Sequence, residues 1–86
     1  MFSKKYIVIF DSIGFAPDFE NAIRQYDGYA KITESSWIII STMQPVDISN
    51  DLLRFLPTGS KLFVSKISSP SAWTNVYNAE WLKRNM

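Results

Sequence analysis

The carboxylate best placed for chemistry is Asp11, which directly follows the apolar run YIVIF at residues 6–10. If two copies of the chain brought their Asp11 side chains together, the carboxylates could bind Mg²⁺ or Mn²⁺, and the metal could activate water against a phosphodiester. An aspartate after a strand also caps the following turn, here with Ser12 and Gly14. Catalysis and metal binding by Asp11 are therefore one hypothesis, and turn capping, favoured by the ordinary loop preference of aspartate, is the other.

The composition removes several other kinds of site. The chain contains no cysteine and no histidine, which excludes thiol catalysis, disulfides, a Ser-His-Asp triad and His-ligated metals. Nine basic and eight acidic residues give a net charge of +1, so no overall basic excess indicates a nucleic-acid binder. The longest apolar runs have five and four residues, far below the roughly 20 needed to span a bilayer. We expect a cytoplasmic protein that does not enter a membrane.

The tail carries three aromatic residues, Trp73, Tyr77 and Trp81, at positions i, i+4 and i+8. On a continuous helix they would form one apolar stripe. Exposed aromatic rings can stack on the bases of a single-stranded nucleic acid, but in a small domain they more often pack in a core or an interface. We therefore interpret these three residues as a packing or dimer-contact surface.

The first half of the chain predicts a strand, a helix and a hairpin. Residues 6–10 lack strict alternation, which indicates a strand covered on both faces. Pro17 suits a first helical turn, and Gly28 is expected to end that helix in a left-handed conformation. Residues 29–33 and 37–42 are rich in β-branched and aromatic residues, and the polar group between them predicts a hairpin.

The second half predicts a helix, a strand and a helical tail. Asp47 is the expected N-cap of the second helix, and Pro57 with Gly59 is expected to end it. Residues 60–67 (SKLFVSKI) predict a fourth strand, and the tail is expected to become helical near Pro70, with Ser69 as its cap.

This order of elements predicts one α+β domain over residues 1–86, with the ferredoxin-like βαββαβ arrangement. The expected fold is a four-stranded antiparallel sheet with two helices on one face and a C-terminal helical tail. Right-handed crossovers place the first and third strands in the centre. The other face of the sheet has no predicted helix, so we expect the tail or a second copy of the chain to cover it.

A family resemblance is carried by YIVIFDSI, SSWIIIS, KLFVSKI and the tail pattern AW…EWLK. In these segments the chain resembles the Cas2-like family, especially its small SinR-like proteins. The resemblance implies a ferredoxin-like homodimer and, for Cas2 proteins, a CRISPR-associated role with divalent-metal nuclease activity in some members. Asp11 matches the first-strand aspartate of that group. The chain departs from the family pattern in having no arginine before Arg24 and a tryptophan-bearing helix in place of the last strand.

Three functional classes remain open. The leading hypothesis is a non-enzymatic homodimer that binds another protein or its own copy. The second is a metal-dependent endonuclease or RNase that uses Asp11 with Mg²⁺ or Mn²⁺. The third is nucleic-acid binding without cleavage, as an accessory of a CRISPR or mobile-element system. The absence of a recognisable catalytic set favours the first.

Overall fold

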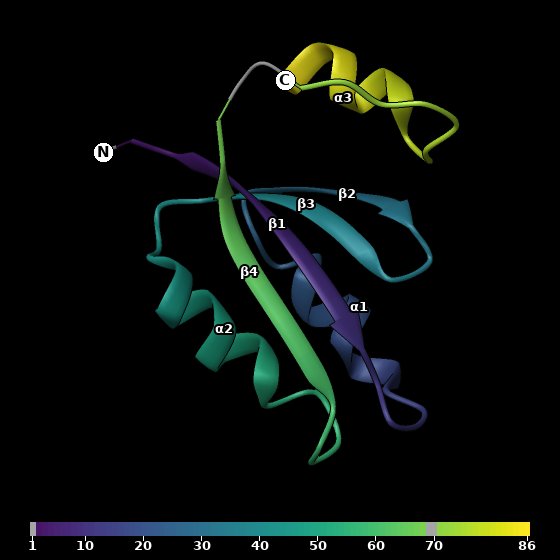
Figure 1. Ribbon diagram of the computed structural model, residues 1–86. Helices are drawn as coiled ribbons and strands as arrows, with labels where there is room; N and C mark the ends of the chain where they lie inside the picture. Colours follow the sequence, from purple (N-terminus) through teal and green to yellow (C-terminus); the bar gives the residue numbers. More distant parts are fainter. Residues whose placement is uncertain (1, 69–70) are drawn as a thin grey trace.

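The computed structural model describes residues 2–68 and 71–86 (Figure 1). These residues form a four-stranded antiparallel sheet and three helices. None of the helices in these two ranges is long and apolar enough to cross a membrane. The elements, in chain order, are β1 (Lys4–Asp11), α1 (Pro17–Ile23), β2 (Gly28–Thr33), β3 (Ser36–Ser41), α2 (Pro45–Leu53), β4 (Lys61–Ile67) and α3 (Ala79–Asn85).

The strand order in the sheet is β2-β3-β1-β4, and every neighbouring pair is antiparallel. The prediction that the first and third strands are central is therefore confirmed. Val8 of β1 marks the middle of the sheet, because it lies opposite Trp37 on one side and Val64 on the other. This arrangement is compatible with the predicted ferredoxin-like topology, and α3 is present in addition to α1 and α2.

The main core lies between the sheet and the helices α1 and α2, which cover the same face (Figure 1). Side chains of a strand alternate between the two faces of the sheet, so alternate residues of β1 and β3 point toward these helices. The fully or almost fully buried members of this core are Tyr6, Val8, Phe19, Ile23, Trp37, Ile39, Ile48 and Leu52. The apolar runs that predicted buried strands thus supply this layer.

Each of the first two helices has a predicted boundary signal that is wrong, and α2 ends at Leu53, before Pro57 and Gly59. Asp47 is not the N-cap of α2: the helix begins at Pro45 after Gln44, and Asp47 lies in its first turn. Proline fits the first helical position because its missing N–H would have no partner there. Gly28 does not end α1, which already ends at Ile23, and it has no left-handed conformation. It is the first residue of β2, where a Cβ atom would lie 2.8 Å from Cδ1 of Ile40.

The tail is helical only at its end. Helix α3 begins at Ala79, so the predicted continuous helix from near Pro70 is wrong, and the expected cap Ser69 lies with Pro70 outside the described residues. Asn75 and Asn78 both have φ of 59°, the left-handed region that asparagine tolerates better than most residues. Because these two residues break the helical path, the i, i+4, i+8 stripe does not form.

The tail covers part of the sheet face that α1 and α2 leave open (Figure 1). Leu82 of α3 is buried, and α3 contacts β2. A cavity of about 310 Å³ lies between the tail and Ile7, Ile32 and Ile38 of the sheet. The expectation that the tail covers this face is therefore met on one side of the sheet only. On β1 and β4, Ile9 and Phe63 remain 41% and 57% exposed.

A side-chain hydrogen bond joins α1 and α2 near their C-terminal ends. The hydroxyl of Tyr26, just after α1, donates a hydrogen bond of 2.8 Å to the carboxylate of Asp51 in α2. Burial, together with this bond to a carboxylate, raises the pKa of Tyr26. Partial burial alone would raise the pKa of Asp51, but the hydrogen bonds from Tyr26 and Arg54 outweigh it and hold that pKa below its usual range.

We expect Asp51→Asn to lower the free energy of unfolding by about 1 kcal/mol at pH 7, because a charge-assisted hydrogen bond is weakened. A carboxyl whose folded pKa is depressed stabilises the fold above its unfolded pKa, and this contribution is lost as the pH falls through the folded pKa. The wild type should therefore lose its advantage over the variant below pH 3.8, the ordinary value for aspartate. Urea unfolding from pH 7 to pH 2.5 measures this difference.

The exposed Asp27, which has no side-chain partner among the described residues, provides the control substitution Asp27→Asn. If the free energies of unfolding of wild type and Asp51→Asn differed by a constant amount across this pH range, the stabilising role of the Tyr26–Asp51 hydrogen bond would be contradicted.

Candidate functional site

Asp11 is the last residue of β1 and is exposed. It lies opposite Lys61 in the register of β1 and β4. Its carboxylate makes no hydrogen bond or ion pair with any residue that the structure describes. The turn after it is held by other groups: the Ser12 hydroxyl donates to the carbonyl of Gly14, and the backbone N–H of Ile13 donates to Oγ of Ser60 at 3.0 Å. The capping expected of Asp11 is thus supplied by the two serines.

A metal site at Asp11 would need ligands from elsewhere. Among residues 2–68 and 71–86, no three carboxylates come close enough together to hold a metal ion. Glu20, which lies nearby in sequence, bonds instead to Lys31 and Arg24. One carboxylate per chain is a weak site for a divalent cation, which takes several oxygen ligands. Catalysis and metal binding by Asp11 therefore remain predictions that depend on a second copy of the chain.

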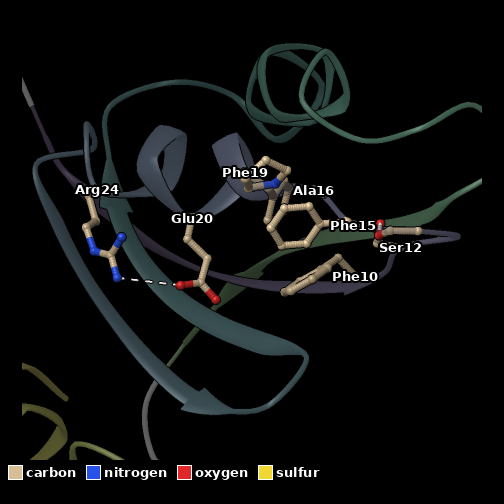
Figure 2. A pocket seen from close by; sticks show the side chains of 9 residues that line it. Phe10, Ser12, Phe15, Ala16, Phe19, Glu20 and Arg24 are labelled. Carbon is tan, nitrogen blue, oxygen red and sulfur yellow. Dashed lines mark hydrogen bonds and ion pairs between the residues drawn. The ribbon is translucent and has the colours of Figure 1, made fainter.

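A hollow of about 490 Å³ lies beside the β1–α1 loop (Figure 2). Phe10 and Phe19 form its apolar wall, with ring centroids 4.4 Å apart. Phe15 of the loop is 89% exposed, and Glu20 and Arg24 pair with each other at the far side. Asp11 does not line this hollow. The lining offers an apolar contact surface and a neutralised ion pair, but no nucleophile paired with a base.

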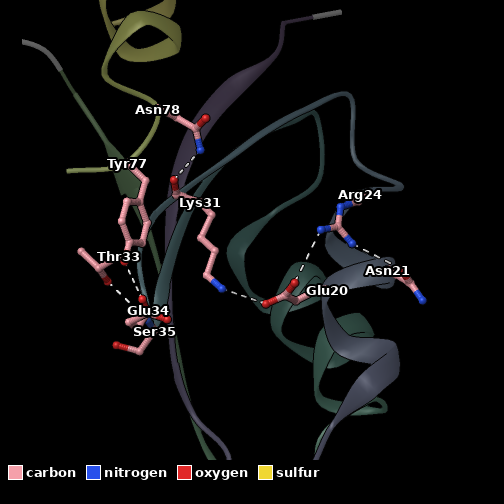
Figure 3. A network of polar contacts seen from close by, with 9 residues as sticks. All are labelled: Glu20, Asn21, Arg24, Lys31, Thr33, Glu34, Ser35, Tyr77 and Asn78. Carbon is pink, nitrogen blue, oxygen red and sulfur yellow. Dashed lines mark hydrogen bonds and ion pairs between the residues drawn. The ribbon is translucent and has the colours of Figure 1, made fainter.

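A polar network joins α1 to the edge strand β2 (Figure 3). Glu20 bonds to Nζ of Lys31 at 3.0 Å and to Arg24 at 3.5 Å. Both cations also lie near the ring of Trp37, 5.9 and 5.8 Å from its centroid. Because one carboxylate serves two cations, only about one unit of positive charge is left uncompensated in this cluster. The network therefore positions α1 on the sheet and does not create a strongly basic surface.

The three aromatic residues of the tail lie in different environments. Trp73 lines the cavity beneath the tail, and Trp81 lines a separate hollow of about 240 Å³ beside Lys31. Tyr77 connects the tail to the sheet: its backbone N–H donates to the carbonyl of Ile32, and its hydroxyl donates to Glu34. This bond to a carboxylate raises the pKa of Tyr77. The structure does not bring the three residues together, and their role as an interface stays a prediction.

The exposed apolar pair formed by Ile9 and Phe63 was not predicted from the sequence. These residues lie opposite each other on neighbouring strands, and both point away from α1 and α2. The signal was present in the β4 sequence, where Leu62 and Val64 alternate with Phe63. Such alternation places Phe63 on the face opposite to the helices. Without the register, however, its neighbour on β1 could not be identified.

No family model matches the chain, and neither does any curated protein or solved structure with which it was compared. The function is therefore argued from the geometry of the chain.

The two serines, rather than Asp11, should determine the stability of the β1–α1 turn. We expect Ser60→Ala to lower the free energy of unfolding by about 1 kcal/mol, because the N–H of Ile13 loses its acceptor. Asp11→Ala should change it by no more than about 0.5 kcal/mol, as for a surface residue without contacts. Chemical denaturation of the two variants provides the measurement. A larger loss for Asp11→Ala than for Ser60→Ala would restore the capping role to Asp11.

Proposed function

We propose that this chain is a small ferredoxin-like domain of the Cas2-like, SinR-like type that acts as a non-enzymatic homodimer. In this proposal its task is protein interaction, and apolar side chains of the two copies pack against each other. The order of elements and the central positions of β1 and β3 support the fold assignment. The sequence resemblance is the basis for the family.

The observation that carries this function is the Ile9–Phe63 pair on the open face of the sheet. An isoleucine and a phenylalanine lie side by side on adjacent strands, and both remain substantially exposed although the tail covers the neighbouring part of the same face. Burying such side chains removes apolar area from water and favours association. Large apolar side chains gathered on one face are typical of interaction surfaces.

The charges favour protein over nucleic acid as the partner. Glu20 neutralises one of the two positive charges of the Arg24 and Lys31 cluster, and the net charge of the chain is only +1. Nucleic-acid affinity depends mainly on uncompensated lysine and arginine residues that contact phosphates. Association with nucleic acid would therefore need a basic surface that forms only when two chains combine.

Sedimentation velocity from 1 to 200 μM should reveal a reversible dimer of the wild-type chain. Phe63→Lys should raise its dissociation constant at least about tenfold, because it introduces like charges into a two-fold interface. Phe15→Lys makes the same change at a more exposed phenylalanine on the β1–α1 loop, and it should leave the dissociation constant unchanged. A wild type that stays monomeric throughout this range would overturn the proposed function.

The unused carboxylate of Asp11 favours a second candidate, a divalent-metal-dependent endonuclease or RNase. In that case cleavage of RNA or DNA should require Mg²⁺ or Mn²⁺ and should fall at least about tenfold in Asp11→Asn, since a metal ligand is weakened. A gel assay with and without EDTA measures this, and Asp27→Asn is the charge-matched control. Cleavage that is equally fast in Asp11→Asn would remove Asp11 from the mechanism.

A further inference from the structure

We propose that two copies of this chain pair through the outer edges of their β4 strands, in antiparallel orientation, to form one continuous eight-stranded sheet. The two-fold axis passes through Val64. This inference rests on the proposed homodimer and specifies which surface forms it. The partner is a second copy of the chain.

Backbone N–H and C=O groups along the outer edge of β4 are available for pairing with another strand. The N–H of Phe10 donates to the carbonyl of Ser35, so the even-numbered residues of β1 bond toward β3 and the odd-numbered ones toward β4. In the observed register, odd-numbered β1 residues lie opposite odd-numbered β4 residues, as for Ile9 and Phe63. The backbone N–H and C=O groups of Leu62, Val64 and Lys66 therefore point outward. Within residues 2–68 and 71–86, the one hydrogen bond to these groups is a long one, 3.5 Å, from the Ser65 hydroxyl to the carbonyl of Lys66.

The outer edge of β4 can pair with the same edge of a second copy in one register that uses all of its outward-pointing backbone groups. With the axis at Val64, Leu62 lies opposite the partner's Lys66, and Val64 lies opposite the partner's Val64, so all three outward residues of each copy are paired. Shifting the axis by one residue either way leaves one of the three unpaired. The chosen register also keeps Lys61 opposite the partner's Ile67, so that no two lysines face each other directly.

Helix α2, which packs against β4, also exposes apolar side chains on its side away from α1. Asp51 of α2 points toward α1, because it accepts the hydrogen bond of Tyr26. At about 100° per residue, Val46 and Leu53 lie within about 20° of each other and roughly 150° from Asp51. These two residues are 64% and 47% exposed, and they lie on the flank of α2 that faces away from α1. They lie roughly 130° from the buried Ile48 and Leu52, so they face solvent on the side of the molecule where α2 packs against β4.

The β4 side of the molecule thus presents apolar side chains in both layers. Phe63 projects from the open face of the sheet, and Val46 and Leu53 project from the helix layer. In the paired arrangement, Phe63 and the partner's Phe63 become diagonal neighbours, which is within reach of aromatic side chains. Helix α2 then lies beside its counterpart. In a single chain, the exposed lysines at positions 61 and 66 disfavour nonspecific pairing of this edge with other strands.

The inferred pairing also has a consequence for Asp11. In the inferred dimer the two Asp11 residues are three strand spacings apart across the sheet and six residues apart along the strands. These separations place them roughly 25 Å apart. Two carboxylates at that distance cannot share a metal ion. The β4 dimer and a metal site formed by two copies of Asp11 are therefore mutually exclusive arrangements.

A cysteine scan tests the register directly, because the native chain contains no cysteine. In the inferred dimer the two Val64 Cα atoms are about 5.5 Å apart, which is within disulfide range. The Ser65 Cα atoms are about 8 Å apart, which is outside it. With oxidised glutathione at a protein concentration where the wild type is dimeric, Val64→Cys should become mostly cross-linked, and Ser65→Cys should cross-link at least tenfold more slowly.

A proline pair tests the backbone bonds. The N–H of Val64 points outward, so Val64→Pro removes no hydrogen bond within one chain, whereas Ser65→Pro removes one to β1. Val64→Pro should raise the dimer dissociation constant at least tenfold while its unfolding midpoint stays closer to wild type than that of Ser65→Pro. If Val64→Pro does not fold, the cysteine pair still decides the question. A dimeric wild type with no preference for the Val64→Cys cross-link would overturn the β4 pairing alone, whereas a monomeric wild type would overturn the proposed function as well.

Discussion

The structure depends on one constraint: a chain of 86 residues has few residues with which to cover both faces of its central sheet. Helices α1 and α2 supply one complete layer, and Val8, Trp37 and Ile39 pack against it. Among the residues that the structure describes, the tail lies on the opposite face, and it reaches one side of the sheet. A small domain buries a low fraction of its surface on folding. Each apolar side chain left uncovered therefore removes a larger share of the stabilisation that burial provides. The exposed Ile9–Phe63 pair is a direct consequence of this shortage.

The sequence predicted the fold well because the relevant information is distributed. The central strands were identified from whole apolar runs, and no single residue decided the topology. The errors occurred where one residue was given a specific role, as with Asp47 and Gly28. Gly28 was expected to end the first helix, but it begins β2, and the side chain of Ile40 lies within 2.8 Å of where its Cβ atom would be. That contact joins two strands, and local sequence patterns contain no information about it.

The candidate site was predicted less completely for the same reason. Asp11 was correctly placed at the end of a strand, but the groups that hold its turn come partly from Ser60, which is 47 residues away from Ile13. Trp73, Tyr77 and Trp81 have helical spacing, yet Asn75 and Asn78 adopt left-handed conformations that separate them. The register of β1 and β4, which puts Ile9 beside Phe63, depends on tertiary packing. These features arise from long-range contacts that become definite only in the folded chain.

The tail also restricts where the proposed partner chain could bind. Its Tyr77 donates a backbone hydrogen bond to Ile32, and Asn78 donates from its side chain to the carbonyl of Lys31. Both bonds occupy acceptors along the edge of β2, and α3 lies against the same strand. The sheet has two edges, and the tail blocks one of them while it covers the adjoining part of the open face. The remaining edge, β4, is the one that carries Phe63 on one side and α2 with Val46 and Leu53 on the other. In the proposed dimer, a tail that shields one edge therefore leaves the opposite edge for association, so the segment that packs on the sheet of one chain also restricts how two chains could combine.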